Sequence, residues 1–383
     1  MTQATMSRAE GFLAEVNDYS AQNYHPLPVV LEGGEGSWVW DVDGNRYLDM
    51  LSAYSAVNQG HRHPVIISAA LRQMEKLTLT SRAFHNDQMG PFLKMLCEVT
   101  GFEKALPMNT GAEAVETAIK MVRKWGYKVK GVPEGRAEII VCDNNFHGRT
   151  TTIVGFSSED QYKEGFGPFT PGFVEIPYGD SGALEEAINE NTVGFLVEPL
   201  QGEGGVIVPP EGFLGTAREL CTAKGVAFMA DEIQTGLGRT GRMFCCDWES
   251  VRPDVQIVGK ALGGGVYPVS ATIADAEFMD VFNPGDHGST FGGNPLGAAV
   301  GLASLRVIVD EALPERSDQL GSWFMDELRS LQSPHVKEVR GKGLMIGVVI
   351  KESSGLARPF CEALHARGIL AKETHHQVIR FAP

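Results

Sequence analysis

The run Asp254–Gly265 ends an apolar stretch in a lysine, Lys260, and follows it with glycines. A charged amine is unfavourable at the end of a core strand, and burial there lowers the pKa of the lysine, which favours its uncharged amine. The glycines leave room for a bulky group to approach the backbone. The run therefore fits a lysine that forms a Schiff base with an aldehyde cofactor, and it also fits a surface lysine beside a flexible loop.

Two more runs place polar groups where ligands bind. Asp231 follows an apolar strand, the position at which open α/β sheets bind ligands, although a capping aspartate would look the same. The run Met108–Ala114 opens a helix whose backbone N–H groups, with Gly111, fit either an anion cup or a plain N-cap at Asn109 or Thr110. The sequence has no Walker motif and no strand–GxGxxG–helix unit, which disfavours a nucleotide site.

These residues need a sheet to hold them. Periodicity predicts helices after Pro64 and at about 91–100, 111–125, 212–224 and 296–311. It predicts strands at 138–142, 151–156, 193–197, 226–230, 255–258 and 269–273. This alternation indicates an α/β fold with a mostly parallel central sheet.

The last part of the chain mixes helices and short strands, which indicates a smaller α+β domain. We expect an N-terminal arm at 1–54 with a hairpin turning at Asp43–Gly44, a large domain at 55–305 and a small domain at 306–383.

Composition limits the partners and the compartment. The chain has 383 residues, 43% of them hydrophobic and 21% charged, which is typical of a soluble globular protein with two or three lobes. A net charge of −15 argues against nucleic acid or an anionic membrane as a partner. The 6 cysteines lack zinc or redox spacing, and Met1–Arg8 lacks the apolar segment of a secretory signal. We therefore expect a cytoplasmic protein with reduced thiols.

Further motifs follow one another from about residue 18 to the end. They are Asn23–Pro28, Tyr54–His61, Leu79–Phe84, Lys124–Tyr127, Gly165–Phe169, Glu198–Glu203, His287–Thr290 and Val378–Pro383. Together with the lysine, aspartate and helix-start runs, they resemble the class III (ω-amino acid) aminotransferases, and within that class the ornithine aminotransferases. The resemblance implies the fold type I of enzymes that depend on pyridoxal phosphate (PLP), a large α/β domain with a smaller α+β domain.

The resemblance implies a role for each residue around the PLP ring. Lys260 forms the Schiff base and later shuttles the proton between substrate and cofactor. Asp231 pairs with the ring nitrogen and keeps the ring an electron sink. Gln234 contacts the phenolic oxygen, and Phe146 stacks on the ring face.

The resemblance also implies which residues bind the phosphate of PLP. Gly111 and Ala112 donate backbone N–H groups to it. Ser289 and Thr290 reach the phosphate of the neighbouring subunit's cofactor, so we expect a homodimer or a dimer of dimers.

Five residues are implied in choosing small-molecule substrates. Arg149 takes the carboxylate farthest from the cofactor, which places the δ-amine of ornithine at the reacting end. Tyr24 and Tyr54 read the α-amine. Glu203 and Arg380 form an ion pair with ornithine bound and separate when 2-oxoglutarate needs the arginine. The implied reaction converts L-ornithine and 2-oxoglutarate into glutamate 5-semialdehyde, which cyclises to pyrroline-5-carboxylate, and L-glutamate.

Two features depart from the family pattern. His147 stands where the animal enzymes carry a tryptophan, beside the cofactor stack. Family members continue past Pro383 with a strand and a helix, so we expect the small domain to be incomplete here. The spacing His61-Arg62-His63 suggests a metal only weakly, because no carboxylate or cysteine partners are evident, and we expect none.

Three other functions remain open from the residues. One is an ω-aminotransferase that acts on N-acetylornithine, lysine or 4-aminobutyrate, which Tyr54 with Tyr24 disfavours. Another is a non-catalytic chain that keeps the fold and binds PLP or a partner. The third is a nucleotide-binding oxidoreductase.

Overall fold

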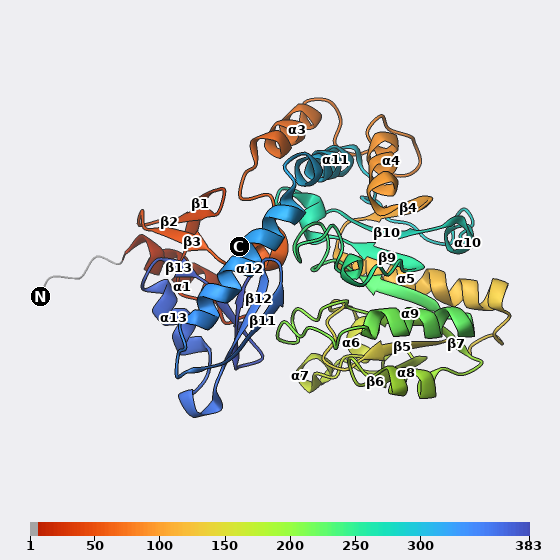
Figure 1. The fold of residues 1–383 in the computed structure, drawn as a ribbon. Coiled ribbons are helices and arrows are strands. Elements are labelled where there is room, and N and C mark those ends of the chain that lie inside the picture. The colour runs from red at the N-terminus through yellow and green to blue at the C-terminus, as the bar shows by residue number, and fades with distance from the viewer. Residues whose placement is uncertain (1–6) are drawn as a thin grey trace, which may run out of the picture.

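The computed structural model describes residues 7–383, so residues 1–6 of the expected N-terminal arm lie outside the described part. A 7-stranded sheet forms the centre of the larger lobe (Figure 1). In spatial order its strands are β4 (Lys104–Met108), β10 (Ser270–Ala274), β9 (Val255–Val258), β8 (Ala227–Asp231), β7 (Thr192–Val197), β5 (Glu138–Cys142) and β6 (Phe173–Ile176). From β9 to β6 all neighbours are parallel, and β10 runs antiparallel to both β4 and β9. The predicted mostly parallel sheet is confirmed.

Helices cover both faces of this sheet, because its strands are apolar on both sides. Ile139 and Val141 face one hydrophobic cluster, whereas Ile140 and Cys142 face another, as the two-residue period of a strand requires. The first face is covered by α5 (Gly111–Trp125), its continuation at Gly126–Lys130, α6 (Thr151–Gly155) and α10 (Ala276–Met279). The other is covered by α4 (Met89–Thr100), α8 (Ser181–Ala187), α9 (Phe213–Lys224) and α11 (Pro295–Asp310).

The strand predicted at 151–156 is wrong, because α6 occupies these residues. The β-branched run Thr151–Val154 favours a strand by local propensity. However, the Thr150 hydroxyl accepts a hydrogen bond from the N–H of Ile153 at 3.3 Å and caps a helix. Ile153 and Val154 are then buried, so tertiary packing outweighs the local preference.

Two smaller sheets make up the rest of the molecule. One is antiparallel, with the order β11 (Val336–Lys342), β12 (Met345–Ile350), β15 (Val378–Phe381) and β14 (Lys372–Thr374), and it packs with α12 (Leu313–Ser330) and α13 (Arg358–His365). The other has the order β1 (Leu31–Glu35), β2 (Trp38–Asp41), β3 (Arg46–Asp49) and β13 (Ile369–Leu370). The predicted hairpin at Asp43–Gly44 joins β2 to β3 and is confirmed. Because β13 pairs with β3, the strands near the N-terminus lie beside a strand from the last fifteen or so residues of the chain (Figure 1).

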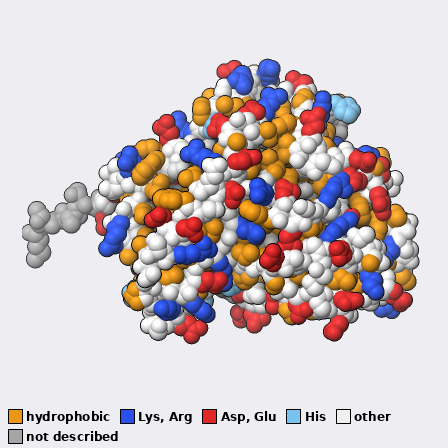
Figure 2. Space-filling model, viewed as in Figure 1, with side chains coloured by type: hydrophobic (Ala, Val, Ile, Leu, Met, Phe, Trp, Pro, Cys, Tyr) orange, Lys and Arg blue, Asp and Glu red, His pale blue; other side chains and the backbone are white. Residues whose placement is uncertain are grey.

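The remaining elements are short or peripheral. They are α1 (Arg8–Tyr19), the turn α2 (Ser52–Ser55), α3 (Pro64–Met74), α7 (Asp160–Lys163), and single turns at Cys245–Glu249, Lys260–Gly263 and Glu352–Ser354. Among residues 7–383, no helix is both long enough and apolar enough to cross a membrane. On the face drawn in Figure 2, Lys and Arg side chains are scattered among Asp and Glu.

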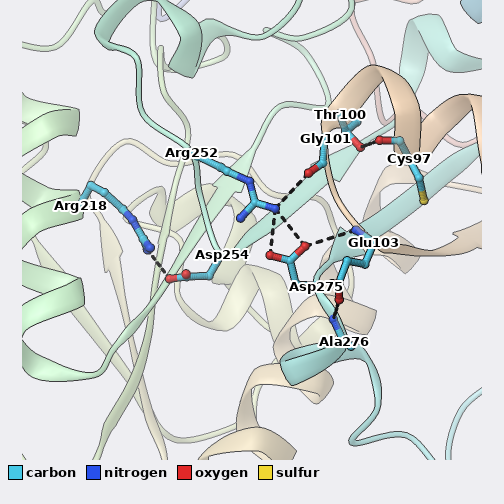
Figure 3. A network of polar contacts seen from close by, with 9 residues as sticks. All are labelled: Cys97, Thr100, Gly101, Glu103, Arg218, Arg252, Asp254, Asp275 and Ala276. Atoms are coloured by element: carbon cyan, nitrogen blue, oxygen red, sulfur yellow. Dashed lines mark hydrogen bonds and ion pairs between the residues drawn. The ribbon is translucent and has the colours of Figure 1, made fainter.

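A polar network ties the edge of the central sheet to the helix before it (Figure 3). Arg252 donates to the carbonyl of Gly101 at 3.1 Å and to both oxygens of Asp275 at 2.9 and 2.8 Å. The N–H of Glu103 donates to Asp275 as well, at 3.2 Å. These bonds join the end of α4, the approach to β4 and the end of β10 at one edge of the sheet.

Candidate active site

Lys260 follows β9 and enters a tight turn with a φ of 44°. A positive φ is unfavourable for a residue with a Cβ, so the surroundings must hold it. The carbonyl of the next residue, Ala261, accepts hydrogen bonds from Gln59 Nε2 at 2.9 Å and from the Ser304 hydroxyl at 2.7 Å. The lysine therefore leaves the sheet edge on a fixed backbone.

The surroundings of Lys260 favour its neutral amine. Burial lowers its pKa, while the charges of Glu203 and Asp231 oppose this, and the net direction is downward. A neutral amine is the nucleophile that a Schiff base requires.

Asp231 ends β8 and meets a histidine that lies 84 residues earlier in the chain. Its Oδ2 lies 2.7 Å from Nδ1 of His147, and its Oδ1 accepts the N–H of Ile233 at 3.1 Å. Burial alone would lower the pKa of His147, but the hydrogen bond to Asp231 and its charge outweigh burial and raise that pKa. The carboxylate is thus held in place by a buried imidazole.

Sequence reasoning placed His147 only beside the cofactor stack and missed this contact. Its position next to Phe146 is the one signal in the sequence that points to the same pocket.

Glu198 is a third buried acid beside this pair. Burial raises its pKa to about 7, although the N–H groups of Phe146 at 2.8 Å and Gly202 at 3.2 Å donate to its carboxylate. Its hydrogen bond to Phe146 fixes the backbone of the segment that carries His147.

A cavity of about 190 Å³ lies between these groups. Its lining is Gly111, Ala112, Phe146, His147, Gly148, Glu198, Asp231, Ile233, Gln234, Thr235 and Lys260. A second cavity of about 380 Å³ shares Gly111 and Lys260 with the first and extends along Asn109–Thr110 and Gly265–Val269. The predicted cofactor residues other than Ser289 and Thr290 therefore converge on one place.

The start of α5 is where the sequence predicts an anion cup. Thr110 and Glu113 form a reciprocal cap, which leaves the N–H groups at Gly111 and Ala112 directed from the helix start. A Cβ at Gly148 would lie 2.9 Å from that of Ala112, so only glycine fits against this helix start.

The cavity's chemistry fits PLP. It offers an amine for the aldehyde at Lys260, a carboxylate for the ring nitrogen at Asp231, an aromatic face at Phe146 and a helix N-terminus for the phosphate. Gln234 enters the same cavity across Gly202, where an added Cβ would lie 1.5 Å from the amide oxygen of Gln234.

Glu203 and Arg380 form an ion pair above this cavity. Arg380 Nη1 donates to Glu203 Oε1 at 2.6 Å, and Arg380 is 1% exposed. Burial would raise the pKa of Glu203, but the charge and hydrogen bond of Arg380 outweigh it and lower the pKa. Gln234 Nε2 donates to the same Glu203 oxygen at 3.3 Å and to the carbonyl of Tyr54 at 3.3 Å. The guanidinium of Arg380 lies 4.8 Å from the centre of the Tyr54 ring.

The other predicted substrate residues lie at the mouth of the site. Arg149 is exposed, and its guanidinium lies 4.2 Å from the ring centre of Tyr162 and 5.6 Å from that of Phe146. Tyr162 was missed by sequence reasoning, since it stands on a short helix without a motif. Tyr24 is 68% exposed. Burial raises the pKa of Tyr54, and the charge of Glu203 adds to this effect while that of Arg380 opposes it.

Ser289 and Thr290 lie beside the helix start rather than in either cavity. The Ser289 hydroxyl accepts hydrogen bonds from Asn109 Nδ2 at 2.9 Å and from the N–H of Gly292 at 3.0 Å, and Thr290 is exposed. That Ser289 and Thr290 bind the phosphate of a neighbouring subunit's cofactor stays a prediction.

Within residues 7–383, no group of three or more His, Cys, Asp and Glu side chains is arranged to hold a metal ion. His61 Nε2 lies 2.7 Å from Asp49, and His63 Nε2 lies 3.0 Å from Glu311. Each histidine therefore faces a single carboxylate.

Comparison with known proteins gives a consistent picture. The profile of the family Aminotransferase class-III matches residues 19–383. The ornithine aminotransferases of Geobacillus sp. (strain WCH70) and Bacillus subtilis (strain 168) are each 59% identical over 378 residues, which is 99% of this chain and 94% of theirs.

Solved structures agree. An ornithine aminotransferase from Toxoplasma gondii, crystallised with partial occupancy of PLP at its active site, is 48% identical with a TM-score of 0.97 and covers 99% of this chain and 90% of its own. An acetylornithine aminotransferase from Elizabethkingia anophelis is 49% identical with a TM-score of 0.89 and covers 98% of this chain and 94% of its own. The chain belongs to the class III aminotransferase family.

Proposed function

We propose that this protein is a PLP-dependent ornithine δ-aminotransferase. It transfers the δ-amino group of L-ornithine to 2-oxoglutarate and yields L-glutamate and glutamate 5-semialdehyde, which cyclises to pyrroline-5-carboxylate. The observation that carries the proposal is the ion pair of Glu203 with the buried Arg380, 2.6 Å apart, with the Arg380 guanidinium 4.8 Å from the centre of the Tyr54 ring. A site that must accept a diamino acid in one half-reaction and a dicarboxylate in the other needs an arginine that can be hidden and released.

PLP, when bound, supplies an electron sink for charge that develops on the substrate carbon. Asp231, held by His147, would pair with the ring nitrogen of a bound PLP and would stabilise its protonated form. Lys260 Nζ removes the proton from the δ-carbon of ornithine, and its depressed pKa keeps it basic without being charged. The N–H groups of Gly111 and Ala112 would hold the phosphate of the cofactor.

Substrate orientation follows from the charged residues around the mouth. Arg149 binds the α-carboxylate of ornithine, which directs the δ-amine toward Lys260. The hydroxyl groups of Tyr54 and Tyr24 accept hydrogen bonds from the α-amine. With 2-oxoglutarate, Glu203 moves away, Arg380 binds the α-carboxylate and Arg149 binds the γ-carboxylate.

We further propose that the protein works in the cytoplasm as a homodimer in which Ser289 and Thr290 complete the partner's phosphate site. The hydrogen bond that holds Ser289 beside Asn109 at the helix start supports a place for this loop near the phosphate cup.

A second candidate is N-acetylornithine aminotransferase, which the likeness to the Elizabethkingia anophelis protein favours. N-acetylornithine lacks a free α-amine, so Tyr54 and Tyr24 would have no charged group to bind. Mixing purified protein with L-ornithine alone should shift the visible absorbance of the cofactor in a single turnover. N-acetylornithine, L-lysine and 4-aminobutyrate at equal concentration should do so at least tenfold more slowly, and a faster reaction with N-acetylornithine would replace the proposal by this second candidate.

A further inference from the structure

The segment Ser52–Ser55 forms a left-handed turn built without glycine. Its φ values are 52°, 48°, 61° and 69°, and the ψ values of Ala53 and Tyr54 are 47° and 45°. Residues with a Cβ visit this conformation one at a time, because the Cβ crowds the following carbonyl oxygen. Several in a row persist only where the surroundings hold them, and such strained segments concentrate at functional sites.

Asp49, the last residue of β3, holds the start of this turn. Its Oδ1 accepts the N–H groups of Leu51 at 2.9 Å and Ser52 at 3.0 Å. Its Oδ2 lies 2.7 Å from Nε2 of His61. Asp49 is 9% exposed, so these partners replace water around its carboxylate.

His61 is itself fixed by the neighbouring sheet. Its backbone exchanges hydrogen bonds with Gly36, at 2.8 Å from its N–H and 3.1 Å to its carbonyl. A Cβ at Gly34 would lie 3.0 Å from Cγ of the imidazole, so this glycine leaves the space that the ring fills. The sheet therefore holds the histidine, and the histidine orients the carboxylate.

The turn ends on the pair that selects the substrate. The carbonyl of Tyr54 accepts a hydrogen bond from Gln234 Nε2, which also donates to Glu203, at 3.3 Å in each case. The Tyr54 ring lies against the guanidinium of Arg380 at 4.8 Å. A change in the turn therefore moves the phenol relative to both members of the pair.

We propose that Asp49 and His61 are positioning residues that keep the Ser52–Ser55 turn left-handed, and that this turn sets the preference for ornithine by aiming Tyr54. The inference rests on the proposed function, since it concerns how the same site reads the α-amine. Neither Asp49 nor His61 contacts the predicted cofactor cavity, so their effect passes through the turn.

The chain offers a matched control in Asp41, at the end of β2. Asp41 is 6% exposed, and its Oδ1 accepts two backbone N–H groups, from Asp43 at 3.0 Å and Asn45 at 2.8 Å. Its Oδ2 accepts the hydroxyl of Tyr47 at 2.8 Å. It therefore caps a backbone turn in the same way as Asp49, but its turn is the β2–β3 hairpin, which carries none of the site residues.

The test compares Asp49→Ala with Asp41→Ala in the PLP-loaded enzyme. Single-turnover rates are measured separately with L-ornithine and with L-glutamate. For Asp49→Ala we expect kcat/KM for ornithine to fall about tenfold or more, the value of one charge-assisted hydrogen bond, while that for glutamate changes less than about threefold. For Asp41→Ala we expect a comparable fall in melting temperature and an unchanged ratio of the two rates. Equal ratios in both variants would overturn the proposal.

Two further measurements keep the result interpretable. Amide hydrogen exchange of the cofactor-free protein should accelerate across residues 50–57 in Asp49→Ala and not in Asp41→Ala. Unaltered exchange across these residues in Asp49→Ala would refute the role of Asp49 in holding the turn. Adding Ala53→Gly to Asp49→Ala should recover part of the ornithine rate, because glycine adopts a positive φ without strain. If Asp49→Ala fails to fold, His61→Gln replaces it with the same expected ratio. A wild-type protein that reacts with glutamate but not with ornithine would contradict the proposed function. The exchange measurement would still show whether Asp49 holds the turn.

Discussion

Removing the carboxylate of Glu203 tests the substrate switch directly. In Glu203→Ala, Arg380 loses its partner at 2.6 Å and stands free for an α-carboxylate, while the α-amine of ornithine meets an unpaired cation. We therefore expect the half-reaction with ornithine to slow and L-glutamate to become a better amino donor.

The size of the effect follows from the contact. A hydrogen bond between charged groups contributes about 1.5–3 kcal/mol, and the Glu203 side chain is 25% exposed, so we take the lower limit. Since about 1.4 kcal/mol is a factor of ten, each half-reaction should change about tenfold, in opposite directions. The ratio of glutamate to ornithine kcat/KM should then rise about a hundredfold.

The assay is stopped-flow absorbance of the PLP-loaded enzyme with each amino donor alone. Glu373→Ala is the control, because Glu373 lies on β14, beside the strand β15 that carries Arg380, and pairs with Arg358 at 3.3 Å, and both of these side chains are 19% exposed. Its ratio should equal that of the wild type. A wild-type ratio in Glu203→Ala would refute the switch.

The pH dependence of this pair has a defined sign. Because the folded pKa of Glu203 lies below its ordinary value of 4.5, the pair contributes stability above that pH and loses it only as the pH falls through the lowered folded pKa. The ratio of the two half-reactions should therefore stay constant across neutral pH.

Three other variants test the rest of the site. Lys260→Ala should abolish covalent attachment of PLP, because no other amine lines the cavity, and intact-protein mass spectrometry after borohydride treatment should find no added cofactor. Asp231→Asn should still attach PLP but turn over about 10²–10³-fold more slowly, as expected when one preorganised charge is lost, and steady-state kinetics would measure this. Burial raises the pKa of Glu232 to about 7 in the folded state, whereas in the unfolded state the group releases its proton near its ordinary pKa of 4.5. The free energy of unfolding therefore falls as the pH rises between these two values. Glu232→Gln should flatten this fall, by on the order of 3 kcal/mol in urea titrations at pH 5 and pH 7.5, and parallel curves for the two proteins would contradict it.

Much of the architecture could be predicted because its signals are local. The apolar runs that end at Asp231 and Lys260 identify core strands, and parallel strands bring their carboxyl ends to one edge. The helix beginning at Gly111 carries its own capping signal in Thr110 and Glu113. The segment 151–156 was predicted wrongly, since its β-branched residues favour a strand, whereas the Thr150 cap and the burial of Ile153 in the core cluster of α5 favour a helix.

The sequence by itself determined the chemical groups, because a buried lysine, an aspartate at a strand end and a glycine-flanked helix start are each written in neighbouring residues. The pair of Arg380 with Glu203, 177 residues apart, was expected only from the family resemblance, and the structure contains it. Tertiary structure alone decided that His147 meets Asp231 across 84 residues and that Asp49 meets the turn that carries Tyr54. The physical reason is that hydrophobic periodicity specifies which face of an element is buried, whereas a polar contact between distant elements depends on how those faces pack together.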